Sequence, residues 1–172
     1  MHQPREDGPR SFGSAFTGVD GAGGGSGPLP GAQEVFFRVE GMEPAPQGSK
    51  RHLGNGVMVE NCKRVKPWRL LVADAAVRAG ASMLRGPVTM SAVFLFARPM
   101  GHYRKDGSLK PSAPEHHAVK PDGSKLIRST EDALSRLVFE DDSRIVTGMW
   151  HKRYCVGQER PGAIITITQL KA

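Results

Sequence analysis

The sequence predicts an α/β (α+β mixed) fold, in which a small mixed β-sheet has two main helices packed on it. Strand-like and helix-like segments follow one another in the order strand, strand, helix, strand, helix, strand, strand. A chain of 172 residues has the usual length of one domain with a buried core. Residues 1–33 hold nine of the 21 glycines and four of the 13 prolines. We therefore expect a disordered Gly/Pro-rich tail over residues 1–34 and a folded domain over residues 35–172.

Order is expected to begin at residues 35–39, whose β-branched and aromatic composition is typical of a strand. Residues 41–51 contain two prolines and two glycines and predict a turn-rich loop that ends on Lys50 and Arg51. Such a loop can lay backbone N–H groups and cations along phosphates. A plain connector with a solvated basic end is an equally good interpretation of the loop alone.

A short strand is expected at residues 57–59 and a helix at residues 65–79. This helix has one apolar face with spacings of three and four, made of Trp68, Leu71, Val72, Ala75, Ala76 and Ala79. We expect Trp68 to anchor the core. Cations crowd the first turns, where they oppose the helix macrodipole: Lys63, Arg64, Lys66 and Arg69. Phosphate contact would explain these cations, and a solvated basic face is the alternative.

Residues 88–97 form the longest strand-like run, with apolar residues of both parities. This pattern predicts a central strand that is buried on both faces. The polar residues 98–119 predict a long loop, which is either functional or disordered. His116 and His117 lack the spacing of helical metal ligands, so we expect both on the surface.

A second helix is expected to start at Asp122, a good N-cap residue, with a buried side made of Leu126, Ile127, Ala133, Leu134 and Leu137. Ser124, Arg128 and Glu131 share another face through steps of four and three. Residues 145–155 and 163–168 predict two further strands, joined by the turn at residues 157–162 as a hairpin. Lys152 and Arg153 add a basic pair to that hairpin.

Two adjacent carboxylates, Asp141 and Asp142, follow the second helix. Carboxylates that are held close together repel one another, and a divalent cation between them removes that penalty. Residues 120–144 therefore suggest a Mg²⁺ site. An acidic turn after a solvated helix explains the same stretch equally well.

The charge of the chain points to a polyanionic partner. The net charge is 24 − 17 = +7, and the pI is near 9.8. Residues 1–34 carry two arginines and four acids, a net charge of −2, which leaves 22 − 13 = +9 on residues 35–172. A body this basic that still gathers acids in one place suits a polyanionic partner that is processed with a metal, although many basic soluble domains bind no particular partner.

Several classes of protein are disfavoured. Cys62 and Cys155 lie far apart and form no CxxC pair, so neither a disulfide framework nor a zinc site is indicated. No apolar run approaches the length of about 18–20 residues that a membrane span needs, and no apolar segment of a signal peptide follows Arg5 and Arg10. We therefore expect a cytoplasmic protein with no membrane partner.

The chain resembles the RusA-type Holliday junction resolvases, small endonucleases that are common in phages and prophages. The resemblance covers about residues 35–168 and rests on three motifs in a fixed order. These are the Gly-x-x-Pro-x-Pro-x-Gly-x-x-Arg loop at residues 41–51, the Lys-Pro-Asp-Gly-Ser-Lys-Leu-Ile-Arg stretch at residues 120–128 with Asp-Ala-Leu at 132–134, and Asp-Asp-Ser-Arg-Ile-Val at 141–146. The late Lys152 and Tyr154, before a Pro-Gly turn, also fit.

The resemblance implies a homodimer of small α/β subunits that binds a four-way DNA junction and cuts symmetric strands with Mg²⁺, or with Mn²⁺ as a substitute. It implies that Asp122 and Asp142 bind the metal, with Asp141 adjacent. It also implies a role in recombination and repair in the cytoplasm of a bacterial or phage-infected cell, with no small-molecule substrate. Candidate phosphate contacts are Lys50, Arg51, Lys63, Arg64, Lys66, Lys125, Lys152 and Arg153.

Two positions depart from the family pattern. Ser124 stands where the family has a second Asp, and Arg128 stands where it has an essential Lys. A serine hydroxyl can bind Mg²⁺ but brings no charge, and an arginine can stabilise phosphate charge but cannot act as a base. We therefore expect either a resolvase with reduced activity or a non-catalytic junction-binding protein of the same fold. A basic module that binds DNA without junction preference is the third hypothesis.

Overall fold

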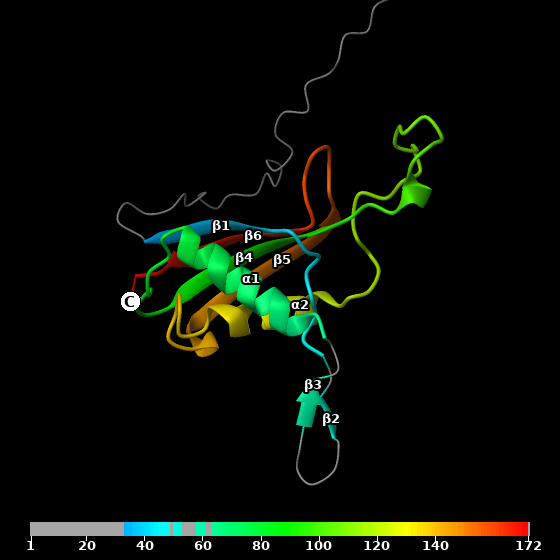
Figure 1. Ribbon diagram of the computed structural model, residues 1–172. Helices are drawn as coiled ribbons and strands as arrows, with labels where there is room; N and C mark the ends of the chain where they lie inside the picture. Colours follow the sequence, from blue (N-terminus) through cyan, green and yellow to red (C-terminus); the bar gives the residue numbers. More distant parts are fainter. Residues whose placement is uncertain (1–32, 49, 53–57, 61–62, 172) are drawn as a thin grey trace, which may run out of the picture.

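The computed structural model describes residues 33–48, 50–52, 58–60 and 63–171 (Figure 1). Apart from its last two residues, the expected N-terminal tail lies outside this range. The described chain has a four-stranded sheet, a two-stranded hairpin and two α-helices, together with the short 3₁₀-helices η1 (Met100–His102) and η2 (Asp142–Arg144). The α/β fold with two main helices is therefore confirmed.

The main sheet is mixed and has the strand order β1-β6-β4-β5. It consists of β1 (Glu34–Glu40), β4 (Val88–Phe96), β5 (Ile145–Tyr154) and β6 (Gly162–Gln169). β1 and β4 each pair antiparallel with β6, and β5 pairs parallel with β4. A separate antiparallel two-stranded sheet of β2 (Lys50–His52) and β3 (Met58–Glu60) projects away from the main sheet (Figure 1).

The expected hairpin of the last two strands is wrong. β5 and β6 are not neighbours, because β4 lies between them. The segment from β4 through the second helix to β5 is a crossover connection, and a crossover returns the chain parallel to its first strand. The seven residues between Tyr154 and Gly162 then pass the end of β4 and lead into β6.

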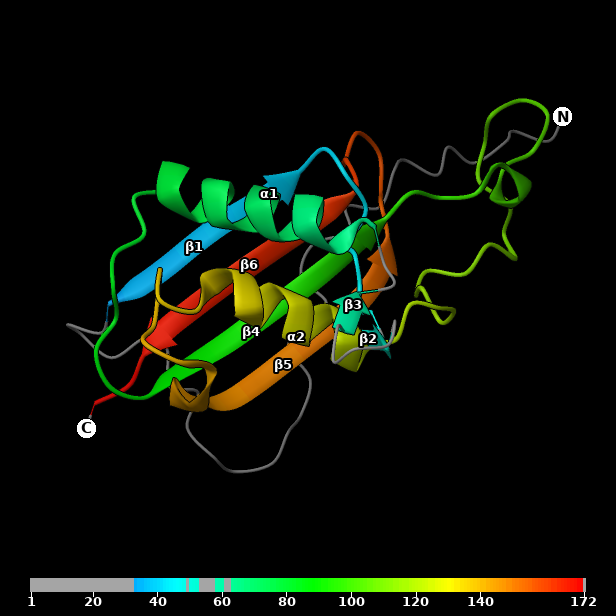
Figure 2. The same ribbon diagram turned by 60° about the horizontal axis from the view of Figure 1, so that its bottom comes forward.

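Both helices pack on the same face of the sheet, as Figure 2 shows. These are α1 (Val65–Arg78) and α2 (Gly123–Leu134). Beneath them lies a core of apolar side chains from the sheet, among them Phe37, Val39, Met90, Phe94, Ile165 and Ile167. The expected burial of β4 on both faces is only partly right. Thr89, Ser91 and Val93 on its other face are half-buried, because that face carries neither helix.

The two helices are joined by a buried polar contact as well as by apolar packing. Trp68 on α1 is fully buried, as expected, and its indole Nε1 donates to Thr130 Oγ1 on α2 at 3.3 Å. The Thr130 hydroxyl in turn donates to the Leu126 carbonyl at 3.0 Å. At the helix surface, Arg69 forms an ion pair with Asp132 at 2.5 Å.

The long loop between β4 and α2 projects from the body of the domain (Figure 1). Its tip is closed by a bridge between Tyr103 and Leu109. The expectation that His117 is on the surface is wrong, because only 7% of it is exposed. Its ring stacks on Phe96 with the centroids 3.8 Å apart and meets the edge of Tyr154, and burial lowers its pKa.

No helix within the described ranges has the length and apolar character needed to span a bilayer.

The two helices end differently, although each is followed by one residue in the left-handed conformation. After α1, Gly80 has a φ of 72° and donates to the Val77 carbonyl, while the next amide reaches the Ala76 carbonyl, which is a Schellman motif. After α2, Ser135 is extended and Arg136 is left-handed, with a φ of 65°, in a turn that the Leu137 amide closes by donating to the Leu134 carbonyl at 3.0 Å. A side chain in this region costs about 1–2 kcal/mol relative to right-handed backbone, so α2 ends under strain and α1 does not.

We predict opposite effects of substitution at these two positions. Arg136→Gly should raise the free energy of unfolding by up to about 1 kcal/mol, because it relieves the left-handed conformation. Gly80→Ala should lower it by about 1 kcal/mol; a Cβ at Gly80 meets nothing within 4 Å, so its effect is purely one of backbone conformation. Urea unfolding of the two variants checks this, and a destabilised Arg136→Gly protein would contradict it.

Candidate functional site

Asp122 stands immediately before the first turn of α2. It occupies the N-cap position, as expected, but its side chain makes no capping hydrogen bond. Its carbonyl accepts from the amides of Lys125 and Leu126 at 3.2 Å each, and its carboxylate forms an ion pair with the Lys125 ammonium at 3.6 Å. The carboxylate of Asp122 is therefore free of backbone bonds and exposed to solvent.

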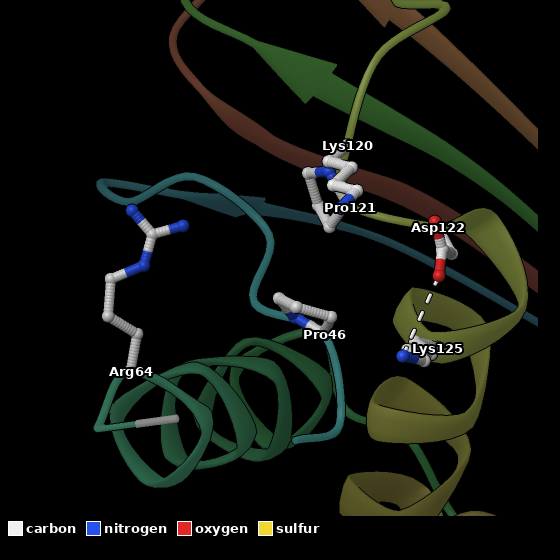
Figure 3. A pocket seen from close by; sticks show the side chains of 6 residues that line it. All are labelled: Pro46, Arg64, Lys120, Pro121, Asp122 and Lys125. Carbon is white, nitrogen blue, oxygen red and sulfur yellow. Dashed lines mark ion pairs between the residues drawn. The ribbon is translucent and has the colours of Figure 1, made fainter. Parts of the chain in front are cut away.

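A pocket of about 450 Å³ adjoins Asp122, and its lining residues come from four separate segments. Figure 3 shows them: Pro46, Arg64, Lys120, Pro121, Asp122 and Lys125. Three cations and one carboxylate leave the lining net positive. Arg64 also reaches Glu43 at 3.7 Å, an exposed contact. A pocket of this charge suits a phosphate group.

Ser124 and Arg128 lie on the exposed side of α2, one turn apart. Both side chains are free to face a ligand, since the buried side of the helix is supplied by Leu126, Ile127 and Leu134. The charge of Arg128 tends to lower the pKa of Glu131 one turn further along, although other effects outweigh it. This arrangement agrees with the prediction that Ser124, Arg128 and Glu131 share one face of the helix.

A second acidic region lies near the other end of α2. Burial raises the pKa of Glu131, and the charges of Asp142 and Asp132 raise it further. Asp132 is neutralised by Arg69 and also accepts from Gln47 at 3.3 Å. The charge on Asp142, at the start of η2, has no ion pair of this kind among the residues that the structure describes.

Asp141 has a local structural task. Its side chain accepts from the Ser143 amide at 3.0 Å and so caps η2. The hydrogen bonds from Ser143 lower the pKa of Asp141, so the carboxylate is ionised at neutral pH. Asp141 as a whole is exposed to solvent.

Asp122 and Asp142 are not brought together within one chain. The charge of Asp142 raises the pKa of Glu131, so these two carboxyl groups lie near each other. Glu131 is nine residues after Asp122, which corresponds to about 13 Å along a helix axis. Figures 1 and 2 both place η2 by the C-terminal half of α2. Within the described parts of the chain, no three His, Cys, Asp or Glu side chains are close enough to hold a metal ion together.

The residues present nevertheless fit a hard divalent cation. Asp122, Asp141 and Asp142 are exposed carboxylates, and Ser124 is exposed as well, so each can offer an oxygen to a cation. Mg²⁺ keeps several waters and needs only one or two carboxylates besides the phosphates of its substrate. A three-ligand cage in the free chain is therefore not required.

The cations predicted to contact phosphates differ in their surroundings. Lys63, Arg64, Lys66 and Lys125 are exposed. The side chains of Lys50 and Arg51 lie outside the described residues. Arg153 instead holds Glu159 through two bonds of 2.5 and 2.7 Å, which lowers the pKa of Glu159 to about 2.

Lys152 and Trp150 on β5 contact the residues on either side of Asp122, an arrangement that the sequence did not predict. The Lys152 ammonium donates to the carbonyls of Val119 and Pro121, directly before Asp122, at 2.7 Å each. The ring of Trp150 lies so close to Gly123 that a Cβ there would overlap it. The signal available in the sequence was only the alternation of β5, which puts residues 150 and 152 on one face.

Comparison with known proteins identifies the family of this chain. No curated protein matches it in sequence. The model of the family described as endodeoxyribonuclease RusA matches residues 42–168, which is most of the chain and includes both helices, the Asp122 pocket and η2. The chain therefore belongs to the RusA endodeoxyribonuclease family, and the expectation drawn from its three motifs is confirmed.

Proposed function

We propose that this protein is a Mg²⁺-dependent, structure-selective endodeoxyribonuclease that resolves four-way DNA junctions in recombination and repair. The observation that carries the proposal is the exposed Asp122 carboxylate beside a pocket lined by three cations, in a chain of the RusA family. An acid at a phosphate-binding pocket is the arrangement that metal-assisted phosphodiester hydrolysis requires. The proposed setting is the cytoplasm of a bacterial or phage-infected cell.

Asp122 and Asp142 would hold the metal, with Asp141 and Ser124 as further ligands. When bound, Mg²⁺, or Mn²⁺ in its place, supplies an activated water and neutralises charge on the scissile phosphate. The exposure of these side chains supports this assignment.

Arg128 would stabilise negative charge on the phosphate as the transition state forms. Its guanidinium stays protonated at every relevant pH, so it serves as an electrostatic group and not as a general base. Its exposed position on α2, one turn after Ser124, supports this role. The cations that would orient the DNA backbone are Lys63, Arg64, Lys66 and Lys125, and the assignment of Lys50, Arg51, Lys152 and Arg153 to phosphate contact stays a prediction.

A homodimer is supported by the outer edge of β5. Segment 115–117 covers the end of this strand through its bonds to Lys152 and Tyr154, whereas the described chain leaves the edge from Ile145 to His151 unpaired. Val146, Met149 and Trp150 there are 58%, 65% and 46% exposed. Long apolar edges of this kind readily pair with another strand.

Antiparallel pairing of two β5 edges about a two-fold axis would have a consequence for the acids. It would bring η2 of one protomer towards the Trp150 end of β5 in its partner, because the interface of a two-fold dimer is self-complementary. Asp142 of one protomer would then approach Asp122 of the other. This would unite the two acidic regions that a single chain keeps apart.

A non-catalytic junction-binding protein is the alternative. Two observations favour it: Ser124 adds no charge to the Asp122 region, and Lys125 already partly neutralises Asp122. The same features would make an active enzyme slow. Junction binding without cutting in either Mg²⁺ or Mn²⁺ would select the alternative.

Loss of the Asp142 carboxylate should abolish cleavage. We expect Asp142→Asn to lower Mg²⁺-dependent nicking of a synthetic four-way junction by more than about a hundredfold, because an amide binds Mg²⁺ far less well than a carboxylate. Asp74→Asn, which removes an exposed acid paired with Arg78 on α1, is the matched control and should cut normally. Unchanged cutting by Asp142→Asn would sink the assignment.

Addition of a carboxylate at position 124 should have the opposite effect. Ser124→Asp should raise the cleavage rate by about tenfold at low Mg²⁺, since an added charge near Asp122 strengthens cation binding. Rates measured over a Mg²⁺ titration, beside wild type, check this. A lower rate would mean that the serine is adapted to its site.

Mixing two inactive variants tests the shared site. If Asp122 and Asp142 of different protomers act together, a heterodimer of Asp122→Asn with Asp142→Asn keeps one site with both carboxylates. The mixture should then nick the junction, although neither variant does so alone. An inactive mixture, with subunit exchange verified by mass spectrometry, would show that each site lies within one chain.

A further inference from the structure

The Lys152 side chain bonds to the backbone of the segment that leads into α2. Its half-buried ammonium donates to two carbonyls, those of Val119 and Pro121, at 2.7 Å each. An ammonium has three N–H donors, so two of the three are already used within the chain. Hydrogen bonds from a charged donor are stronger than neutral ones.

The same segment is joined to β5 by backbone hydrogen bonds a few residues earlier. His117 N donates to the Lys152 carbonyl at 3.1 Å, and Tyr154 N donates to the Glu115 carbonyl at 3.2 Å. Pro121 has no N–H to contribute. The Lys152 side chain is therefore what extends the attachment from residue 117 to the peptide that precedes Asp122.

Trp150 supports the first turn of α2 from the same face of β5. Residues two apart on a strand point to the same side, so Trp150 and Lys152 both reach the start of the helix. The Trp150 ring lies against Gly123, where any Cβ would overlap its six-membered ring. One strand thus contacts the residue on each side of Asp122: Pro121 through Lys152, and Gly123 through Trp150.

We propose that Lys152 and Trp150 are positioning residues that hold Asp122 in place at its pocket, and that Lys152 does not act by contacting a DNA phosphate. The Val119 and Pro121 carbonyls occupy two of the three N–H donors of the ammonium, so at most one donor is left for a phosphate. The proposal rests on the proposed nuclease function for its kinetic consequence, but its structural consequence is independent of cleavage.

Lys152→Met tests the proposal, because it keeps the length of the side chain and removes the ammonium. Lys110→Met is the matched control: the Lys110 ammonium also donates to one backbone carbonyl, that of Gly101, at 2.7 Å, but in the projecting loop. Both full-length variants are compared with wild type in three measurements. These are single-turnover cleavage in Mg²⁺, junction affinity over a salt series in EDTA, and amide hydrogen exchange of peptides that cover residues 118–126.

We expect Lys152→Met to cleave at least about tenfold more slowly while its junction affinity and salt slope stay within twofold of wild type. Amide exchange over residues 118–126 should be faster, and Lys110→Met should match wild type in all three measurements. If Lys152 contacts phosphate instead, affinity falls, the salt slope drops by about 0.9, and exchange is unchanged. Unchanged exchange overturns the proposal even if the wild type proves not to cleave DNA.

A second variant covers the case in which Lys152→Met does not fold. Gly123→Ala should displace the first turn of α2 through Trp150 without touching Lys152, and so slow cleavage and speed exchange over residues 118–126. The double variant Gly123→Ala/Trp150→Ala removes the overlap and should exchange more slowly over these residues than Gly123→Ala. Identical exchange in the single and double variants would overturn the role of Trp150.

Discussion

The buried contact between α1 and α2 is the constraint on which the site depends. Trp68 lies wholly within the core, and its indole N–H must find a partner there, since an unpaired donor costs about 1–3 kcal/mol. It finds Thr130, whose hydroxyl in turn bonds to the Leu126 carbonyl. Together with the burial of Leu126, Ile127 and Leu134, this bond fixes the rotation of α2 about its axis. With the rotation set, Ser124 and Arg128 face solvent, and the apolar side faces the sheet.

Beyond the contact between the two helices, β5 holds the start of α2. It is an edge strand, paired with β4 on one side only over Ile145–His151 in the described structure. Its Trp150 and Lys152 side chains reach the start of α2, and its first residue follows η2, which carries Asp142. One strand therefore connects both acidic regions. It also separates them, because they lie towards its opposite ends, and this separation is why the proposed metal chemistry requires either substrate phosphates or a second protomer.

The charged groups near Asp122 differ from those near Glu131. At Asp122, Lys125 and the other pocket cations offset the carboxylate and prepare the pocket for phosphate. Near Glu131, burial raises the pKa of this carboxyl, and the neighbouring acids Asp142 and Asp132 raise it further. In the proposed function, the cations of the domain would bind the DNA backbone and the carboxylates would bind a metal ion. A metal-dependent nuclease needs both kinds of contact.

The sequence by itself determined the four strands of the main sheet, the two helices, the Trp68 anchor and the family, because periodicity, turn residues and ordered motifs are local properties. It missed β2, whose three residues were predicted as the end of a turn-rich loop. Only the tertiary structure decided that β4 separates β5 from β6, since a short connection past one strand has the same turn signals as a hairpin. It also decided that His117 is buried, that Lys152 bonds to backbone carbonyls, and that Asp122 and Asp142 lie apart. These outcomes depend on contacts between segments distant in the chain, which no local pattern encodes.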